Sequence, residues 1–262
     1  MPSTTTSRMT LRERASTPDY PAQALQAILQ IPTATDPSEL LVRLVKATSA
    51  IGASASVYTA TIPEGNHEPS SYLCLFACDW HYADAQEGLG QILSHPWFRF
   101  ARTHTSPGTQ RQVRVLAWED EKAINLAHQY GFRSCFIVPT SAGPNPERIE
   151  MLCIGSEEAD DFEGPDARIV RTLARSLAAE LHDWLTCYLQ QRLLEAAKLK
   201  DEDVDLLAMQ WQGLNTKQIA QQTGMSVGCV NSRFQRINTR LHCADRRESA
   251  ARAAAYGLLE LT

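Results

Sequence analysis

The chain has 262 residues, of which 44% are hydrophobic and 21% are charged, and its formal net charge is −5. This composition is typical of a globular protein and allows one large domain and one small domain. It excludes a membrane-spanning helix, because no run approaches the roughly 18–20 apolar residues that a bilayer requires.

Residues 1–19 are rich in Ser, Thr and Arg and lack the apolar centre of a secretory signal, so we expect a disordered arm. The chain contains seven cysteines and no Cys-x-x-Cys pair, which indicates neither a zinc knuckle nor a disulfide framework. Several cysteines fall within apolar runs, where a thiol acts as a small hydrophobic side chain, and redox sensing is the alternative. Without a signal or a disulfide framework, the expected location is the cytoplasm.

The spacing of apolar residues predicts helices and strands in alternating groups. Asp36 and Pro37 mark one helix start, since Asp is a good N-cap and Pro suits the first helical position. In chain order we expect helices at 20–31 and 37–51, strands at 55–62 and 71–78, two short helices within 82–104 broken at Pro96, a helix at 118–130, strands at 132–140 and 148–156, and a helix at 166–197. This order predicts an α/β/α sandwich over residues 20–191, with helices on both faces of a sheet.

Residues 192–200 are polar and lose the apolar stripe of the preceding helix, so we expect a linker there. Residues 201–262 predict four short helices, at 202–212, 216–223, 227–242 and 248–259. The second is capped by Asn215 or Thr216, and Gly224 and Ser226 separate it from the third. A glycine-containing turn of this length is typical of a helix-turn-helix, whose second helix lies in the DNA major groove. The expected fold class is therefore α+β, a sandwich followed by a helix-turn-helix domain.

The third of these helices carries the polar side chains expected to contact DNA. Asn and Gln can pair bidentately with adenine, and Arg can pair with guanine or phosphate. Phosphate contacts also suit the N-terminus of the helix before it. Five arginines against one acid lie between Asn231 and Arg247, so this region is basic although the chain is acidic. The candidate DNA-binding residues are Thr216, Lys217, Asn231, Ser232, Arg233, Gln235, Arg236 and Arg240. A solvated basic helix in an ordinary bundle is the alternative.

Residues 199–259 resemble the LuxR-type DNA-binding domain over its full length. The matching positions are Leu199, Asp203, Leu207, Gly213, Ile219-Ala220, Met225-Ser226, Val230, Arg240-Leu241, Arg246 or Arg247, Ala250 and Gly257-Leu258-Leu259. Asp203, Lys200 and Cys229 depart mildly from the family pattern. The resemblance implies a regulator of quorum-sensing or virulence genes that binds a pseudo-palindromic operator in double-stranded DNA as a homodimer. The acidic residues 201–205 add RNA polymerase as a candidate partner.

The element order of residues 20–191 is similar to the quorum-sensing branch of this family, whose α/β/α domain binds an acyl-homoserine lactone. In that family a Trp, a Tyr and an Asp before a Pro hold the lactone. Aligned on Pro96, these positions carry Tyr82, Gln86 and His95. The family's Asp accepts a hydrogen bond from the ligand N–H, whereas neutral His accepts in only one tautomer. The candidate ligand pocket consists of Cys78, Tyr82, Gln86, His95, Trp118 and Cys135.

Several accounts of the first domain stay open. In one account the domain has lost its ligand and serves for dimerisation, with the helix at 166–197 as the expected surface. In another it still binds an acyl-homoserine lactone or another small-molecule signal. The aromatic residues Trp80, Tyr82 and Trp97 also fit a plain core. An enzyme or metal-binding domain is a further alternative, for which His81 and His95 with Cys78 or Asp79 are the candidate ligands. The sequence shows no nucleophile elbow, zinc-protease motif or phosphate-binding glycine loop, so we expect no catalytic site and no cofactor.

Overall fold

The computed structural model describes residues 11–62, 71–87, 92–141 and 148–259. The chain divides into two compact units. The first comprises Met1–Ala60, Leu73–Ser141 and Ile149–His182, and the second comprises Thr61–Tyr72, Ala142–Arg148 and Asp183–Thr262. Among the described residues, no helix combines the length and the apolar character that a bilayer crossing needs.

The first unit is built around an antiparallel sheet. Its described strands are β1 (Ala55–Ile62), β2 (Ser71–Ala77), β3 (Gly108–Thr109), β4 (Ser134–Ser141) and β5 (Ile149–Ser156), in the order β2-β1-β5-β4-β3. In the central pairs Tyr58 lies opposite Leu152, and Ile137 lies opposite Cys153. Every residue of β5 after Ile149 is buried. Because successive side chains of a strand point to opposite faces, both faces of this sheet must be covered.

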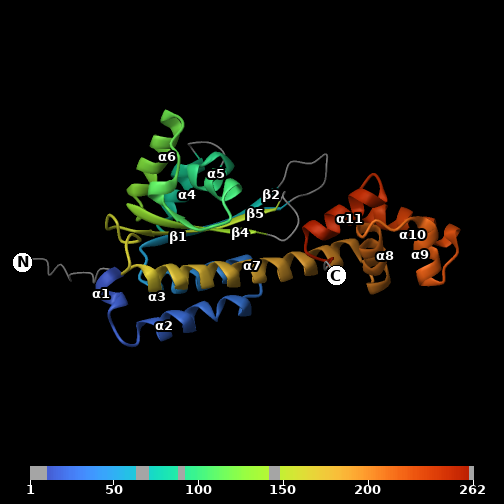
Figure 1. Ribbon diagram of the computed structural model, residues 1–262, viewed down its shortest axis with the longest axis horizontal. Helices are drawn as coiled ribbons and strands as arrows, with labels where there is room; N and C mark the ends of the chain where they lie inside the picture. The colour runs from blue at the N-terminus through green and yellow to red at the C-terminus, as the bar shows by residue number, and fades with distance from the viewer. Residues whose placement is uncertain (1–10, 63–70, 88–91, 142–147, 260–262) are drawn as a thin grey trace, which may run out of the picture. The chain divides into compact units, whose positions relative to one another are not determined.

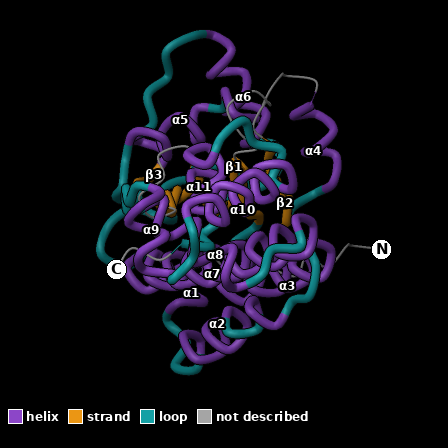
Figure 2. The backbone as a smooth tube through the Cα atoms, turned by 90° about the vertical axis from the view of Figure 1, so that its right-hand side faces the viewer, coloured by secondary structure: helices purple, strands orange, loops and turns teal. Residues whose placement is uncertain are grey.

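Helices provide that cover on each face (Figure 1). On one face lie α2 (Tyr20–Ile28), α3 (Pro37–Ile51) and the first part of α7 (Arg168–Ala197), and on the other lie α4 (Trp80–Glu87), α5 (Pro96–Thr103) and α6 (Trp118–His128). The orange strands of Figure 2 lie between the same two groups. The predicted α/β/α sandwich is confirmed.

Asp36 and Tyr58 show how local sequence and buried contacts hold these layers. Asp36 is the N-cap of α3, and its carboxylate accepts hydrogen bonds from two backbone N–H groups, at 2.8 and 2.9 Å. The buried Tyr58 hydroxyl donates to the Glu150 carboxylate at 2.6 Å, and the same carboxylate oxygen lies 3.1 Å from Nδ1 of His182 on α7. The sheet and α7 are thus joined by a buried polar contact as well as by apolar packing.

Three expectations differ from the structure. Leu11–Ala15 form a short helix, α1, in which Leu11 is buried, so a disordered arm over residues 1–19 is wrong for this stretch; residues 1–10 lie outside the described residues. The segment after α5, for which the sequence predicts no helix or strand, contains β3 and one turn of 3-10 helix at Gln110–Gln112. Helix α7 continues to Ala197, so residues 192–197 of the expected linker are helical.

The second unit contains the four expected short helices. They are α8 (Asp201–Trp211), α9 (Thr216–Thr223), α10 (Val227–Arg240) and α11 (Arg246–Ala255), which confirms the helical part of the predicted fold class. Their buried residues include Leu206, Leu207, Ile219, Val230, Ile237, Leu241 and Ala250, as the apolar spacing indicates. In the C-terminal half of α7, Leu185, Leu189 and Leu193 are also buried.

Candidate functional site

The turn between α9 and α10 is determined by capping residues. The Asn215 side-chain oxygen accepts hydrogen bonds from two backbone N–H groups at the start of α9, at 3.0 and 3.1 Å. Gly224 ends α9 with a φ of +69°, in the left-handed region that favours glycine. Ser226 caps α10 by accepting a backbone N–H at 3.2 Å. Residues 224–226 therefore separate the two helices, as predicted.

One face of α10 is buried and the other is exposed. Val230, Phe234 and Ile237 recur at helical spacing and are buried. The exposed candidates on this helix are Asn231, Ser232, Gln235, Arg236 and Arg240. The amide side chains expected to read bases, Asn231 and Gln235, thus lie on the exposed face of α10.

Arg233, also assigned to that surface, is instead held by acids of α8. Its guanidinium contacts the Glu202 carboxylate and lies 3.2 Å from the Asp203 carboxylate, and its side chain is only 17% exposed. The hydrogen bond from Arg233 holds the pKa of Glu202 below its ordinary value. Arg240 lies 3.6 Å from Asp203 on the other side. These contacts form an ion-pair cluster within the second unit.

At the start of α9, Thr216 and Lys217 differ in exposure. The Thr216 hydroxyl accepts a hydrogen bond from Arg246 at 2.5 Å, and that guanidinium lies over the ring of Phe234, 6.0 Å from its centroid. Lys217 is exposed. The sequence does not predict this contact of Arg246, because Thr216 lies 30 residues away along the chain.

A second set of candidates lies within the core of the first unit. Tyr82 and Gln86 stand one turn apart on α4, and both are buried. Tyr82 and Trp97 each pack against the ring of Phe132, with centroids 5.5 and 5.1 Å apart. His95, at the start of α5, packs against Trp97 at 4.5 Å. The predicted Tyr82 and His95 thus border one aromatic cluster, and the buried Gln86 lies one turn from Tyr82 on α4. We call these residues, with Trp97 and Phe132, the buried site.

The backbone determines the protonation of His95. Its Nδ1 accepts a hydrogen bond from the Trp97 backbone N–H at 3.2 Å, which makes His95 the N-cap of α5. Burial, with a smaller contribution from the nearby Arg99, lowers the pKa of His95 to about 3, so the ring is neutral at pH 7. Since Nδ1 accepts, the single ring proton lies on Nε2, which is a donor.

Three buried polar atoms in the site have no hydrogen-bond partner among the described residues. They are His95 Nε2, Trp97 Nε1 and Gln86 Oε1, from side chains that are 5%, 1% and 6% exposed. Leaving such a group unpaired costs about 1–3 kcal/mol. Most buried polar groups in native proteins are paired, so these three atoms are exceptions within the core of the first unit.

The remaining candidates have different surroundings. Cys135 is buried and donates to Gln110 Oε1 at 3.4 Å. Burial raises the pKa of the half-buried Cys78 to about 12, so the Cys78 thiol is neutral. Trp118 is 67% exposed and lines a surface groove with Lys122, so the structure does not place it in the buried site. No set of three His, Cys, Asp or Glu residues in the described parts of the chain is arranged to hold a metal ion.

Sequence reasoning missed Phe132 and treated Trp97 only as a core aromatic. Trp97 follows directly after the Pro96 on which the alignment rests. The one available signal was its indole N–H, since a buried indole usually finds a hydrogen-bond partner.

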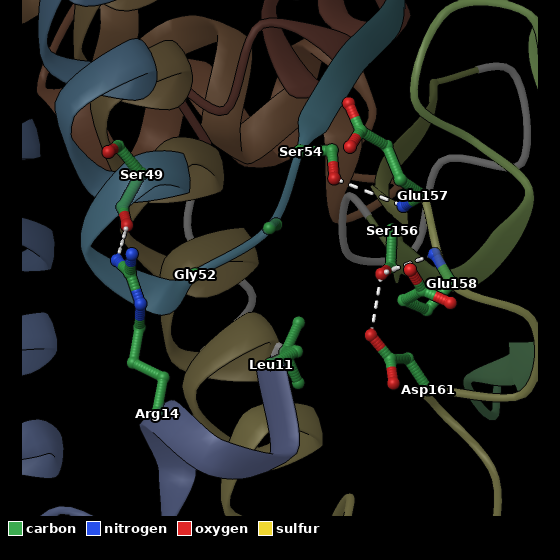
Figure 3. Close-up of a pocket in the computed structure, with 10 residues that line it drawn as sticks. Leu11, Arg14, Ser49, Gly52, Ser54, Ser156, Glu157, Glu158 and Asp161 are labelled. Atoms are coloured by element: carbon green, nitrogen blue, oxygen red, sulfur yellow. Dashed lines mark hydrogen bonds between the residues drawn. The ribbon is translucent and has the colours of Figure 1, made fainter. Parts of the chain in front are cut away.

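A separate small hollow, of about 80 Å³, lies where α1 and the ends of α3 and β5 meet (Figure 3). Figure 3 shows Arg14 donating to the Ser49 carbonyl (2.9 Å) and Ser156 donating to Asp161 (2.6 Å). The hollow contains none of the predicted site residues, and the contacts drawn there tie neighbouring elements to each other.

No protein-family model matches the chain, and no curated protein is similar to it in sequence. Solved structures share its fold. SdiA of Escherichia coli superposes with a TM-score of 0.66 at 12% identity, over 92% of this chain and 99% of SdiA. The structure of SdiA in complex with octanoyl-rac-glycerol superposes with a TM-score of 0.64 at 11% identity, over 94% of this chain and 100% of SdiA. CepR2 of Burkholderia cenocepacia is an N-acylhomoserine lactone-dependent transcription factor of the LuxR family. It superposes with a TM-score of 0.50 at 12% identity, over 63% of this chain and 93% of CepR2.

Proposed function

We propose that this protein is a DNA-binding transcription regulator of the LuxR type. The observation that carries the proposal is the exposed polar face of α10, which follows α9 after a short glycine-containing turn. The fold supports it, since CepR2, a transcription factor of that family, shares it. The resemblance of residues 199–259 to the family's DNA-binding domain is a separate line of support.

In this proposal α10 enters the major groove. Asn231 and Gln235 contact base edges, because their amides are exposed and can pair bidentately with adenine. Lys217 and Arg236 contact phosphates. Arg233 acts indirectly, since its guanidinium is bound by Glu202 and Asp203.

A homodimer would present two copies of α10 to the half-sites of a pseudo-palindromic operator, about one helical turn apart or a multiple. The exposed acids of α8, Asp201 and Asp205, face no basic partner in the described contacts of that helix and are candidates for an RNA polymerase contact. Control of quorum-sensing or virulence genes follows from the family resemblance alone.

For the first unit, the unpaired atoms of the buried site favour a ligand-responsive domain over one that serves only for dimerisation. A domain without a ligand would leave His95 Nε2, Trp97 Nε1 and Gln86 Oε1 uncompensated. If the domain had no ligand, apolar residues could replace these three side chains without loss of function.

Selection of DNA from a random library with the full-length protein tests DNA binding. We expect one pseudo-palindromic sequence to be enriched. Asn231→Ala or Gln235→Ala should then reduce discrimination between that site and random DNA by about 1–3 kcal/mol, roughly 5- to 150-fold. Gln129→Ala, an exposed Gln of the first unit, is the matched control and should change nothing. Enrichment of no sequence, or equal loss from all three variants, would refute the proposal.

A further inference from the structure

Helix α5 and the segment between it and α6 border a groove that is separate from the buried site. Its volume is about 410 Å³, within the range of about 300–1,000 Å³ that is typical of small-molecule sites. Part of α5 forms one wall, and residues 112–116 contribute to the other. None of the residues of the buried site lines this groove. It therefore requires an explanation of its own.

The part of the chain that forms the groove is basic. Residues 95–116 contain four arginines, two histidines and no aspartate or glutamate, although the net charge of the chain is −5. Arg99 is paired with Asp120 on α6. Arg114 also lines the groove, but it is exposed and has no hydrogen bond or ion pair with a described residue. An unpaired guanidinium favours an anion, and its planar group matches a carboxylate through two parallel hydrogen bonds.

Gln112 adds a neutral donor to the same groove. Its Oε1 accepts a hydrogen bond from the Thr109 backbone N–H at 3.0 Å. The amide is thus held by its oxygen, and its NH2 group, which can only donate, has no partner among the described residues. The Thr103 hydroxyl lies 3.1 and 3.2 Å from backbone carbonyls of α5, to which it donates. The uncommitted polar groups of Arg114 and Gln112 are therefore donors, which suits a ligand that accepts.

The remaining lining is apolar or flat. Phe100 and Pro96 come from α5, and Leu116 has a side chain that is 73% exposed, although it is a large hydrophobic residue. The His104 ring stacks on Phe100, with centroids 4.1 Å apart and planes 10° apart. Because His104 is exposed, a second aromatic ring can pack against this stacked pair. An inorganic anion would leave these surfaces in water, so the lining favours an organic acid.

The walls of the groove are held in place by protein contacts alone. Asp120 accepts hydrogen bonds from the Arg99 guanidinium at 2.8 and 2.5 Å, and it also accepts the Leu116 backbone N–H at 2.7 Å. One buried carboxylate thus connects the two sides of the groove. A site that is ordered before its ligand arrives avoids part of the entropy cost of binding.

We propose that this groove binds a small aromatic carboxylic acid as its anion. The carboxylate accepts hydrogen bonds from Arg114 and from the side-chain NH2 group of Gln112, and the aromatic ring packs against Leu116 and the stacked His104. Burial of the ring supplies most of the affinity, because an exposed ion pair contributes little by itself. The charge determines which aromatic molecules are accepted.

Three probes separate these contributions in calorimetric titrations of the full-length protein. The probe 2-naphthoate carries a ring and a charge, 2-naphthamide carries the ring alone, and acetate carries the charge alone. We expect 2-naphthoate to bind in a saturable manner and about tenfold more tightly than 2-naphthamide, since a charge-assisted hydrogen bond is replaced by a neutral one. Acetate should show no binding at the same concentrations. Equal affinities for the two naphthyl probes, or no binding of 2-naphthoate, would refute the inference.

Substitutions at the groove locate the bound acid. Arg114→Gln removes the charge and should abolish the preference for 2-naphthoate over 2-naphthamide. Arg102→Gln is the matched control, because Arg102 is an exposed arginine of α5 that does not line the groove and has no ion pair with a described residue. Leu116→Ser should weaken both naphthyl probes by a similar factor, because it removes apolar contact and leaves the charge. A preference that survives Arg114→Gln, or is lost in Arg102→Gln, would contradict the assignment.

Gln86→Leu tests whether the acid binds in the buried site instead. Leucine is similar in size to glutamine but forms no side-chain hydrogen bond. We expect this variant to bind 2-naphthoate as the unsubstituted protein does. If Gln86→Leu abolishes binding and Arg114→Gln leaves it unchanged, the acid lies in the buried site, and the assignment to the groove is wrong.

Discussion

The ion pair between Arg99 and Asp120 joins α5 to α6 and thereby holds the helix that begins at His95. Both carboxylate oxygens of Asp120 accept from the Arg99 guanidinium, and one also accepts the Leu116 backbone N–H at 2.7 Å. The Asp120 side chain is 6% exposed and that of Arg99 is 32% exposed. Asp120→Asn removes the charge but keeps the size of the side chain.

The cost of this substitution follows from the pKa of Asp120. The hydrogen bonds from Arg99 lower that pKa from 3.8 to about 2. At 1.36 kcal/mol per pKa unit, this difference corresponds to roughly 2–3 kcal/mol. Because one-third of Arg99 is exposed to solvent, which screens the pair, we expect Asp120→Asn to lower the free energy of unfolding by about 2 kcal/mol at pH 7.

The effect should depend on pH in a defined direction. The folded-state pKa lies below the unfolded one, so the ionised carboxylate stabilises the fold above pH 4, and this contribution is lost as the pH falls from about 4 to about 2. Urea unfolding of the variant and the unsubstituted protein between pH 7 and pH 3 measures it, with hydrogen exchange of the α5 and α6 amides as a local readout.

Asp160→Asn is the matched control. Asp160 pairs with Arg111 at 2.7 Å, but both side chains are more than half exposed, and Asn tolerates the φ of +64° found there. Asp160→Asn should therefore lower the free energy of unfolding by less than about 1 kcal/mol. Equal losses from the two substitutions, or a difference that does not narrow in acid, would contradict the reasoning.

Other substitutions test the remaining parts of the structure. Lys217→Ala should weaken binding to all DNA sequences alike and reduce the slope of log affinity against log salt by about 0.9; a changed sequence preference would argue against a phosphate contact. Gly155→Ala should cost about 1–3 kcal/mol in urea unfolding, because its Cβ would lie 2.6 Å from the Gly131 carbonyl oxygen. Gly228→Ala, where the nearest atom lies at 4.0 Å, should instead stabilise by about 0.5–1 kcal/mol, and a similar loss at both glycines would be the contrary result. Asp36→Ala should cost about 1 kcal/mol, measured by exchange of the α3 amides, whereas Asp36→Ser should retain most of the stability.

The helix ends are predictable from the sequence because residues a few positions apart determine them. Asp36 caps the helix that it was expected to cap, and Asn215, one of the two expected candidates, caps α9. The same holds for the sandwich, whose order of elements follows from apolar periodicity. Leu11 is an exception: its burial depends on contacts that a short polar segment does not reveal.

The candidate sites are less predictable because their contacts are distant in sequence or depend on the backbone. Arg233 pairs with Glu202, 31 residues away, and spacing within its own helix gave no sign of this. Trp118 was placed by alignment, but as the first residue of α6 it is exposed. The alignment on Pro96 singles out His95, whereas its tautomer follows only from the backbone N–H that it accepts.

Gly155 bears on how the buried site can change during evolution. A side chain there would start 2.4 Å from the ring of Phe132, so this ring rests directly against the backbone of β5. Trimming a side chain cannot enlarge the site from that direction, since glycine has none to lose. At this point of β5 the space around Phe132 can change only through the ring itself or through the side chains that pack on its other sides, such as Tyr82 and Trp97.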